Sequence, residues 1–176
     1  GDQGVGPRQD REVLAAAARR DEPRLEGVVR VDLGLIELWE GALTDAEMHV
    51  RRSLELVVGQ STIEAYALAA LAQICRARGD RSEAAQLAKR ALATIAPRHE
   101  IHHAGQVWCT LIKCLDGVDA AAYALAVDAG IAWLRTQLCN IGDPELLRSF
   151  LALPETRTLS ETAHRNGYTI ECASFA

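Results

Sequence analysis

The sequence has few aromatic residues and no long apolar stretch. Phe, Trp and Tyr make up 5% of the 176 residues, so leucine and alanine must fill the core of a chain that is 49% hydrophobic. No apolar run reaches the roughly 18 residues of a membrane span, and no signal peptide is recognisable. The formal net charge of −5 leaves no basic stripe of the kind that nucleic-acid binding requires. We expect a cytoplasmic domain that binds neither membranes nor nucleic acid.

The cysteines form no recognisable metal or redox motif. Their number is odd, they lie mostly in helical patterns, and no two are spaced as C-x-x-C. This pattern predicts buried, reduced thiols in a reducing compartment. The cysteines concerned are Cys75, Cys109, Cys114, Cys139 and Cys172.

Alanine at helical spacing dominates the stretch from Ala65 to Pro97. Apolar residues recur every three or four positions on both sides of Gly79, and this spacing predicts two helices with one apolar face each. Gly79 suits the left-handed conformation that follows a helix, and Asp80 suits the N-cap of the next helix. The stretch therefore predicts a helical hairpin with a short turn.

The hairpin recurs with a period of 38 residues, which separates Gly41, Gly79 and Gly117. A single hairpin cannot bury its apolar face, so the period predicts an all-α solenoid of about three antiparallel hairpins. Thr44 and Glu47 form a capping-box pattern at one helix start, and Asp119 is the expected cap of another. Small residues keep the same period where paired helices should cross: Gly34, Ala72 and Thr110; Ala46, Ala84 and Ala122; Ser53, Ala91 and Ala129.

This order of small residue, glycine turn and two alanines resembles the tetratricopeptide repeat. The sequence RSEAAQLAKRALATIAP is similar to the second helix of that family with its closing proline. The period is longer than the usual 34 residues or so, which resembles repeats at the C-terminal end of large bacterial signalling proteins. The pattern departs from the family at Arg30, Cys109 and Gly130.

The sequence divides into three expected segments. Residues 1–10 are Gly-rich and lack a starting methionine, so we interpret them as a linker in an excised fragment. Residues 11–139 hold the TPR-like helical repeats, and residues 140–176 hold capping helices and a tail. Pro144 and Pro154 predict the starts of two short helices that cover the last apolar face of the array.

The resemblance implies a non-catalytic protein-interaction or regulatory module of a larger bacterial signalling or transcription-regulating protein. In this family the first helices of successive repeats line a concave groove, here expected to be apolar and to hold a peptide or an amphipathic helix. Self-association, a small apolar ligand and the chain's own segment after residue 140 are alternative occupants. The implied groove residues are Val28, Val31, Leu35, Trp39, Tyr66, Gln73, Arg76, Val107, Leu111 and Leu115.

One short motif suggests a different function. His99, Glu100 and His103 match H-E-x-x-H, in which two histidines bind zinc and the glutamate acts as general base. In the longer form of this motif, Gln106 and Cys109 stand where a glycine and a third histidine belong. We therefore expect no metal or other cofactor, and a zincin-type hydrolase that uses His99 and His103 remains the alternative.

Overall fold

The computed structural model describes residues 22–95, 101 and 103–170, and over these residues it contains eight helices and no strand. This confirms the all-α prediction. The expected linker at residues 1–10 lies outside the described residues. The helices are α2 (Pro23–Trp39), α3 (Leu43–Leu56), α4 (Ser61–Ala77), α5 (Arg81–Ile95), α6 (Ala104–Leu115), α7 (Ala120–Asn140), α8 (Pro144–Ala152) and α9 (Pro154–Arg165).

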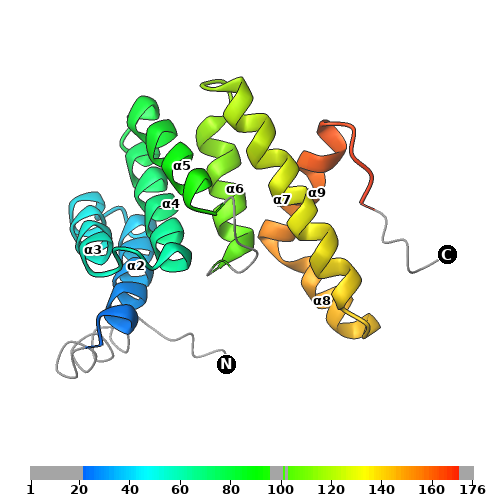
Figure 1. Cartoon of the computed structure of the whole chain (residues 1–176), viewed down its shortest axis with the longest axis horizontal. Helices are drawn as coiled ribbons and strands as arrows, with labels where there is room; N and C mark the ends of the chain where they lie inside the picture. Colours follow the sequence, from blue (N-terminus) through cyan, green and yellow to red (C-terminus); the bar gives the residue numbers. More distant parts are fainter. Residues whose placement is uncertain (1–21, 96–100, 102, 171–176) are drawn as a thin grey trace.

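Helices that follow one another pack as hairpins, and the hairpins stack side by side. The pairs α2–α3, α4–α5 and α6–α7 are in contact, and α4 also contacts α2 and α6. Figure 1 shows α2 and α3 at one end of this array and α7, α8 and α9 at the other. The first helices α2, α4 and α6 therefore lie next to one another, and we call their shared surface the α2–α4–α6 face.

The three turn glycines occupy equivalent positions. Gly41, Gly79 and Gly117 have φ angles of 83°, 90° and 68°, which lie in the left-handed region. A side chain with a Cβ atom is strained in this conformation, so each turn requires glycine. The predicted period of 38 residues is confirmed at these turns.

Helices α2 and α3 cross at very short distance. A Cβ atom added to Gly34 would lie 2.5 Å from Val50 Cγ2 and 2.9 Å from the carbonyl oxygen of Ala46. At the other end of the crossing, Ser53 Oγ donates a 2.7 Å hydrogen bond to the carbonyl oxygen of Gly27. Gly34 is thus required by the closeness of the α3 backbone, and Ser53 lies where its side chain can reach the α2 backbone.

Arg30, where the repeat pattern departs from the family, belongs to a polar network between α2 and α3. Its Nε donates to Glu26 Oε1 at 2.8 Å, and its Nη1 lies 3.4 Å from His49 Nδ1. His49 Nε2 in turn lies 3.5 Å from Glu37 Oε1. Polar contacts replace part of the apolar packing that the family pattern would supply at this crossing.

Aspartate caps form as predicted, whereas the predicted capping box does not. Asp80 Oδ1 accepts from Glu83 N at 2.9 Å, and Asp119 Oδ1 accepts from Ala122 N at 3.0 Å. The prediction for Thr44 is wrong, because α3 begins at Leu43 and its N-cap Ala42 makes no side-chain hydrogen bond. Glu47 instead forms ion pairs with Arg51 and Arg78.

The core is centred on α4. From Ile63 to Cys75 every residue of this helix is buried except Glu64 and Gln73, which are half-buried. Alanines supply much of this surface, and their small size allows α2, α5 and α6 to approach closely. Alanine and leucine side chains thus fill most of the core, in agreement with the low aromatic content of the chain.

The helices after residue 140 close the end of the array. Pro144 and Pro154 open α8 and α9 as predicted. Helix α9 packs against α6 and α7, with Leu159 fully buried, and α8 packs against α9. In Figure 1 both helices lie at the far end from α2 and α3. They therefore cover the last hairpin rather than the length of the α2–α4–α6 face, and residues 171–176 of the tail lie outside the described residues.

The cysteines do not all behave alike. Cys75, Cys109 and Cys114 are buried free thiols, as predicted. The prediction is wrong for Cys139, which is disulfide-bonded and lies exposed in the last turn of α7. Cys172 is outside the described residues. Within the described part of the chain, no helix is long and apolar enough to cross a membrane.

Candidate functional site

Six of the ten groove residues that the resemblance implies are packed inside the protein. Each is between 0% and 3% exposed, so none offers its side chain to a partner in this conformation. The reason is the close approach of neighbouring first helices, which closes the space between α2, α4 and α6. These six are Val31, Leu35, Tyr66, Val107, Leu111 and Leu115.

The other four residues reach the surface. Trp39, the last residue of α2, is 72% exposed, and Arg76 in the last turn of α4 is also exposed. Val28 and Gln73 are half-buried. Because α2 and α4 are neighbouring helices that run in the same direction, Trp39 and Arg76 lie at the same end of the α2–α4–α6 face.

A chain of contacts links α2, α4 and the residue that precedes α6. Its members Tyr66 and His103 were named from the sequence, His103 as a metal-ligand candidate, whereas Asp32 was not. The Tyr66 hydroxyl donates a 2.7 Å hydrogen bond to Asp32 Oδ1 of α2. Its ring lies 4.9 Å from the ring of His103, which precedes α6. Burial, reinforced by the neighbouring Asp32 carboxylate, raises the pKa of the Tyr66 hydroxyl far above its usual value. The hydroxyl is therefore a permanent donor at neutral pH.

The sequence did contain a signal for Asp32. Val28 is the counterpart of Tyr66 one period earlier, and Asp32 lies one helical turn after Val28. Residues one turn apart share a helix face, so Asp32 is placed on the side of α2 that meets Tyr66.

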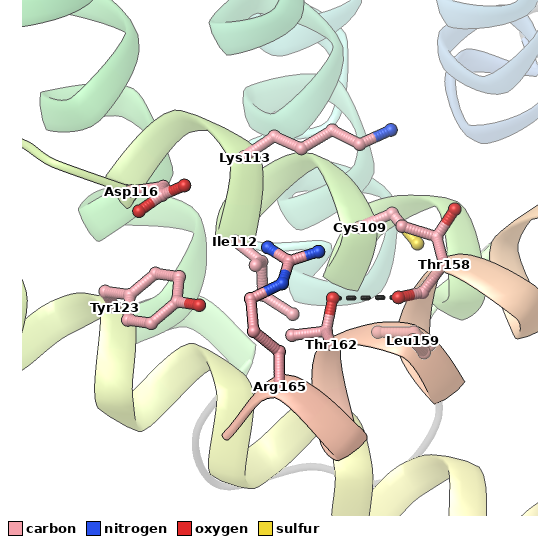
Figure 2. Close-up of a pocket in the computed structure, with 9 residues that line it drawn as sticks. All are labelled: Cys109, Ile112, Lys113, Asp116, Tyr123, Thr158, Leu159, Thr162 and Arg165. Atoms are coloured by element: carbon pink, nitrogen blue, oxygen red, sulfur yellow. Dashed lines mark hydrogen bonds between the residues drawn. The ribbon is translucent and has the colours of Figure 1, made fainter.

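A small cavity lies between α6, α7 and α9 (Figure 2). Its volume is about 80 Å³. Ile112 and Leu159 form its apolar part, and Arg165 of α9 reaches into its centre toward Asp116 and Tyr123. The complete lining is Cys109, Ile112, Lys113, Asp116, Tyr123, Thr158, Leu159, Thr162 and Arg165.

The thiol and hydroxyls of this cavity are already engaged. Cys109 Sγ donates to the carbonyl oxygen of Glu155 at 3.4 Å, and burial raises the pKa of the thiol to about 11. Thr162 donates to the carbonyl oxygen of Thr158 at 2.8 Å, drawn as a dashed line in Figure 2. A protonated thiol is a poor nucleophile, so Cys109 is suited to packing and not to covalent catalysis.

The alternative metal site cannot be assembled from the described residues. His99, Glu100 and His102 lie outside them, so a zincin-type site with His103 stays a prediction. His103 itself has a φ angle of 49°, in the left-handed region, and stacks against Tyr66. Among the residues that the structure places, no three His, Cys, Asp or Glu side chains are grouped so that they could hold a metal ion.

Comparison with known proteins finds a family match over part of the chain. A family model described as tetratricopeptide repeat matches residues 26–95, which correspond to helices α2 to α5. No curated protein and no solved structure matches the sequence.

Proposed function

We propose that the chain is a non-catalytic module that binds a segment of another protein on its α2–α4–α6 face, and the match of residues 26–95 to the tetratricopeptide-repeat family model supports this proposal. The contact surface consists of Val28, Trp39, Gln73 and Arg76, the members of the implied groove that reach the surface.

The exposure of Trp39 is the observation that carries this proposal. An indole that is 72% exposed leaves a large apolar surface in water at the end of α2. Trp and Arg are among the residue types most enriched in the side chains that dominate binding energy at protein interfaces. Trp39 and Arg76 supply one of each at the same end of neighbouring helices.

Two other functions have less support. Pockets for small organic ligands usually measure roughly 300–1,000 Å³, so the cavity between α6, α7 and α9, at about 80 Å³, is too small to be one. A larger hollow of about 470 Å³ at the start of α2 is lined by only five residues, among them Pro23, Leu25 and Val28. The buried Cys109 thiol of the smaller cavity is protonated at neutral pH, which argues against nucleophilic catalysis there.

The 38-residue period resembles the repeats of bacterial signalling and transcription-regulating proteins, and on that resemblance we place the module in a cytoplasmic protein of this kind.

Selection from random peptides tests the proposal while the natural partner is unidentified. A library of random 16-residue peptides displayed on phage is selected against the chain, and the Kd of enriched peptides is measured by fluorescence polarisation. Trp39→Ala and Arg76→Glu should each raise the Kd at least tenfold. Leu125→Ala is the matched control, since Leu125 is 61% exposed on α7 and outside the face; it should change the Kd less than twofold.

Enriched peptides that bind Trp39→Ala and Arg76→Glu as tightly as the wild type would contradict the proposal, as would the absence of any enriched peptide. Sedimentation velocity tests whether the chain associates with a second copy of itself. A dimer that dissociates in Trp39→Ala would make a second copy of the chain the occupant of the face and exclude a foreign peptide.

A further inference from the structure

Three cations stand in the last turns of helices that contact one another in order, α4 with α6 and α6 with α9. Arg76, Lys113 and Arg165 stand in the last turns of α4, α6 and α9, respectively. All three are exposed, and none forms an ion pair within the described residues. We call these three residues the cation row.

Arg76 and Lys113 are close neighbours across the contact between α4 and α6. Burial raises the pKa of the Cys114 thiol to about 11, while the positive charges of Arg76 and Lys113 both act in the opposite direction. Two cations influence the same sulfur atom only when both are near it. Arg76 and Lys113 therefore both lie near this buried sulfur, on two helices that are in contact.

Lys113 and Arg165 are connected by the cavity between α6, α7 and α9. Both line it, and Figure 2 shows the Arg165 side chain rising from α9 to lie beside Ile112. Asp116 lines the same cavity but forms no ion pair with Arg165 in the described structure. Arg76 adds a third cation nearby, while Asp116 and Glu155, whose charge acts on Cys109, supply two acids.

Several other cations in the described chain are paired with carboxylates. Arg51, Arg78 and Lys89 form ion pairs with carboxylates of a neighbouring hairpin. Local cations at helix C-termini also stabilise the helix dipole, but that role does not require Lys113 and Arg165 to line one cavity. In a chain with a formal net charge of −5, a cluster with net positive charge is a local exception.

From this arrangement we infer that the cation row binds an acidic segment of the partner protein, with one carboxylate side chain held in the cavity beside Arg165. This inference rests on the proposed protein-binding function and names the chemistry of the bound segment. A carboxylate accepts two parallel hydrogen bonds from a guanidinium, which is the strongest common pairing of these groups. The cavity of about 80 Å³ suits a single short side chain rather than an organic ligand.

The test uses fluorescein-labelled hexaglutamate as the probe, with hexaglutamine, hexalysine and a ten-nucleotide oligothymidylate for comparison. Binding is measured by fluorescence polarisation in 20 mM and 150 mM NaCl. Hexaglutamate should bind more tightly than the other three, and its affinity should fall at the higher salt concentration. Lys113→Glu and Arg165→Glu should each raise its Kd at least tenfold.

Two further variants separate this site from general charge effects. Arg90→Glu removes an exposed cation of α5 that has no described ion pair, and it should change the Kd less than twofold. Asp116→Asn removes the single acid that lines the cavity and should lower the Kd for hexaglutamate at least twofold. This change is opposite to the increase expected for Lys113→Glu and Arg165→Glu.

Equal binding of hexaglutamate to the wild type and Arg165→Glu would overturn the inference, as would tighter binding of the oligothymidylate. The protein-binding proposal would survive that result if phage-selected peptides without acidic residues still required Trp39. If Trp39→Ala left peptide binding unchanged while Arg165→Glu still weakened hexaglutamate binding, the α2–α4–α6 face would be excluded as the binding surface. The site for an acidic segment would be retained.

Discussion

The Tyr66 hydroxyl of the second hairpin donates a 2.7 Å hydrogen bond to the Asp32 carboxylate of the first. The two residues are 34 positions apart, so the bond connects neighbouring repeats rather than neighbouring turns. It is charge-assisted and lies in a partly buried environment, where such bonds are stronger than neutral ones at the surface. The bond ties α4 directly to α2, the two helices that carry Arg76 and Trp39.

Tyr66→Phe should lower the free energy of unfolding by about 1–2 kcal/mol, because it removes a hydrogen bond to a charged group and leaves the ring in place. Urea denaturation followed by circular dichroism measures this loss. Tyr123→Phe is the control, since the Tyr123 hydroxyl accepts a long, 3.3 Å hydrogen bond from the exposed Asn166 amide. Equal effects of the two substitutions would show that the bond to Asp32 contributes nothing specific.

Gly34→Ala should destabilise the protein by roughly 1–3 kcal/mol, although alanine favours helix formation. The new Cβ atom would meet Val50 Cγ2 at 2.5 Å and a backbone oxygen of α3 at 2.9 Å, and backbone cannot move aside cheaply. Gly142→Ala is the matched control, because a Cβ atom there meets nothing within 4 Å. An unchanged midpoint for Gly34→Ala in urea would mean that the α2–α3 crossing is looser than described.

Asp119→Asn should weaken the dependence of stability on acid pH. The pKa of Asp119 is lowered by the hydrogen bond from the backbone N–H of Ala122 and by Lys89. A carboxylate with a lowered folded-state pKa stabilises the protein above its unfolded pKa of about 3.9, and this contribution disappears as the pH falls through the folded-state value. Asparagine keeps an N-cap acceptor but does not titrate.

The stability difference between wild type and Asp119→Asn should therefore be present at pH 6 and vanish near pH 2. Urea unfolding at a series of pH values gives this difference directly. A difference that stays constant over the whole range would show that titration of Asp119 is not coupled to folding.

The three buried thiols should resist alkylation in the folded protein. Their ionisation at high pH should destabilise the folded state. Burial, the largest effect at each site, raises the pKa of Cys75, Cys109 and Cys114 to about 11 from a reference of 9.0. The folded state therefore keeps these protons longer than the unfolded state. Their stabilising effect is complete below pH 9 and is lost as the pH rises from 9 to 11.

Mass spectrometry after iodoacetamide treatment at pH 8 should find these three cysteines unmodified in the native protein and modified in 6 M guanidinium chloride. Replacing all three by alanine should flatten the stability profile between pH 9 and pH 11. Rapid native-state labelling of Cys109 would contradict its burial beside Leu159.

Local features of the fold were predictable because they depend on backbone conformation within a few residues. A left-handed turn needs glycine, which identified Gly41, Gly79 and Gly117, and a proline in the first turn marked the start of α8 and α9. The prediction that Thr44 caps α3 failed because residue type alone suggested the cap. The first residue of α3 depends instead on how this helix packs against α2.

The site was less predictable because exposure depends on the distance between helices. Leu35 and Leu111 have the spacing of face residues, but the close packing of α2, α4 and α6 buries them. Substitution of these leucines by charged residues would therefore unfold the core and say nothing about binding. The cation row was also missed, since its members come from helices that only stacking brings together.

The position of α4 between two other hairpins determines where the molecule opens first. Helix α4 contacts α2, α3, α5 and α6, whereas α2 and α3 contact one hairpin besides their own and α8 contacts mainly α9. Amide hydrogen exchange should therefore be slowest in α4 and progressively faster toward both ends of the array. A partner that contacts both Trp39 at one end of the array and Arg165 at the other would suppress this local opening of the terminal helices. Its binding would therefore slow amide hydrogen exchange even in helices that it does not contact.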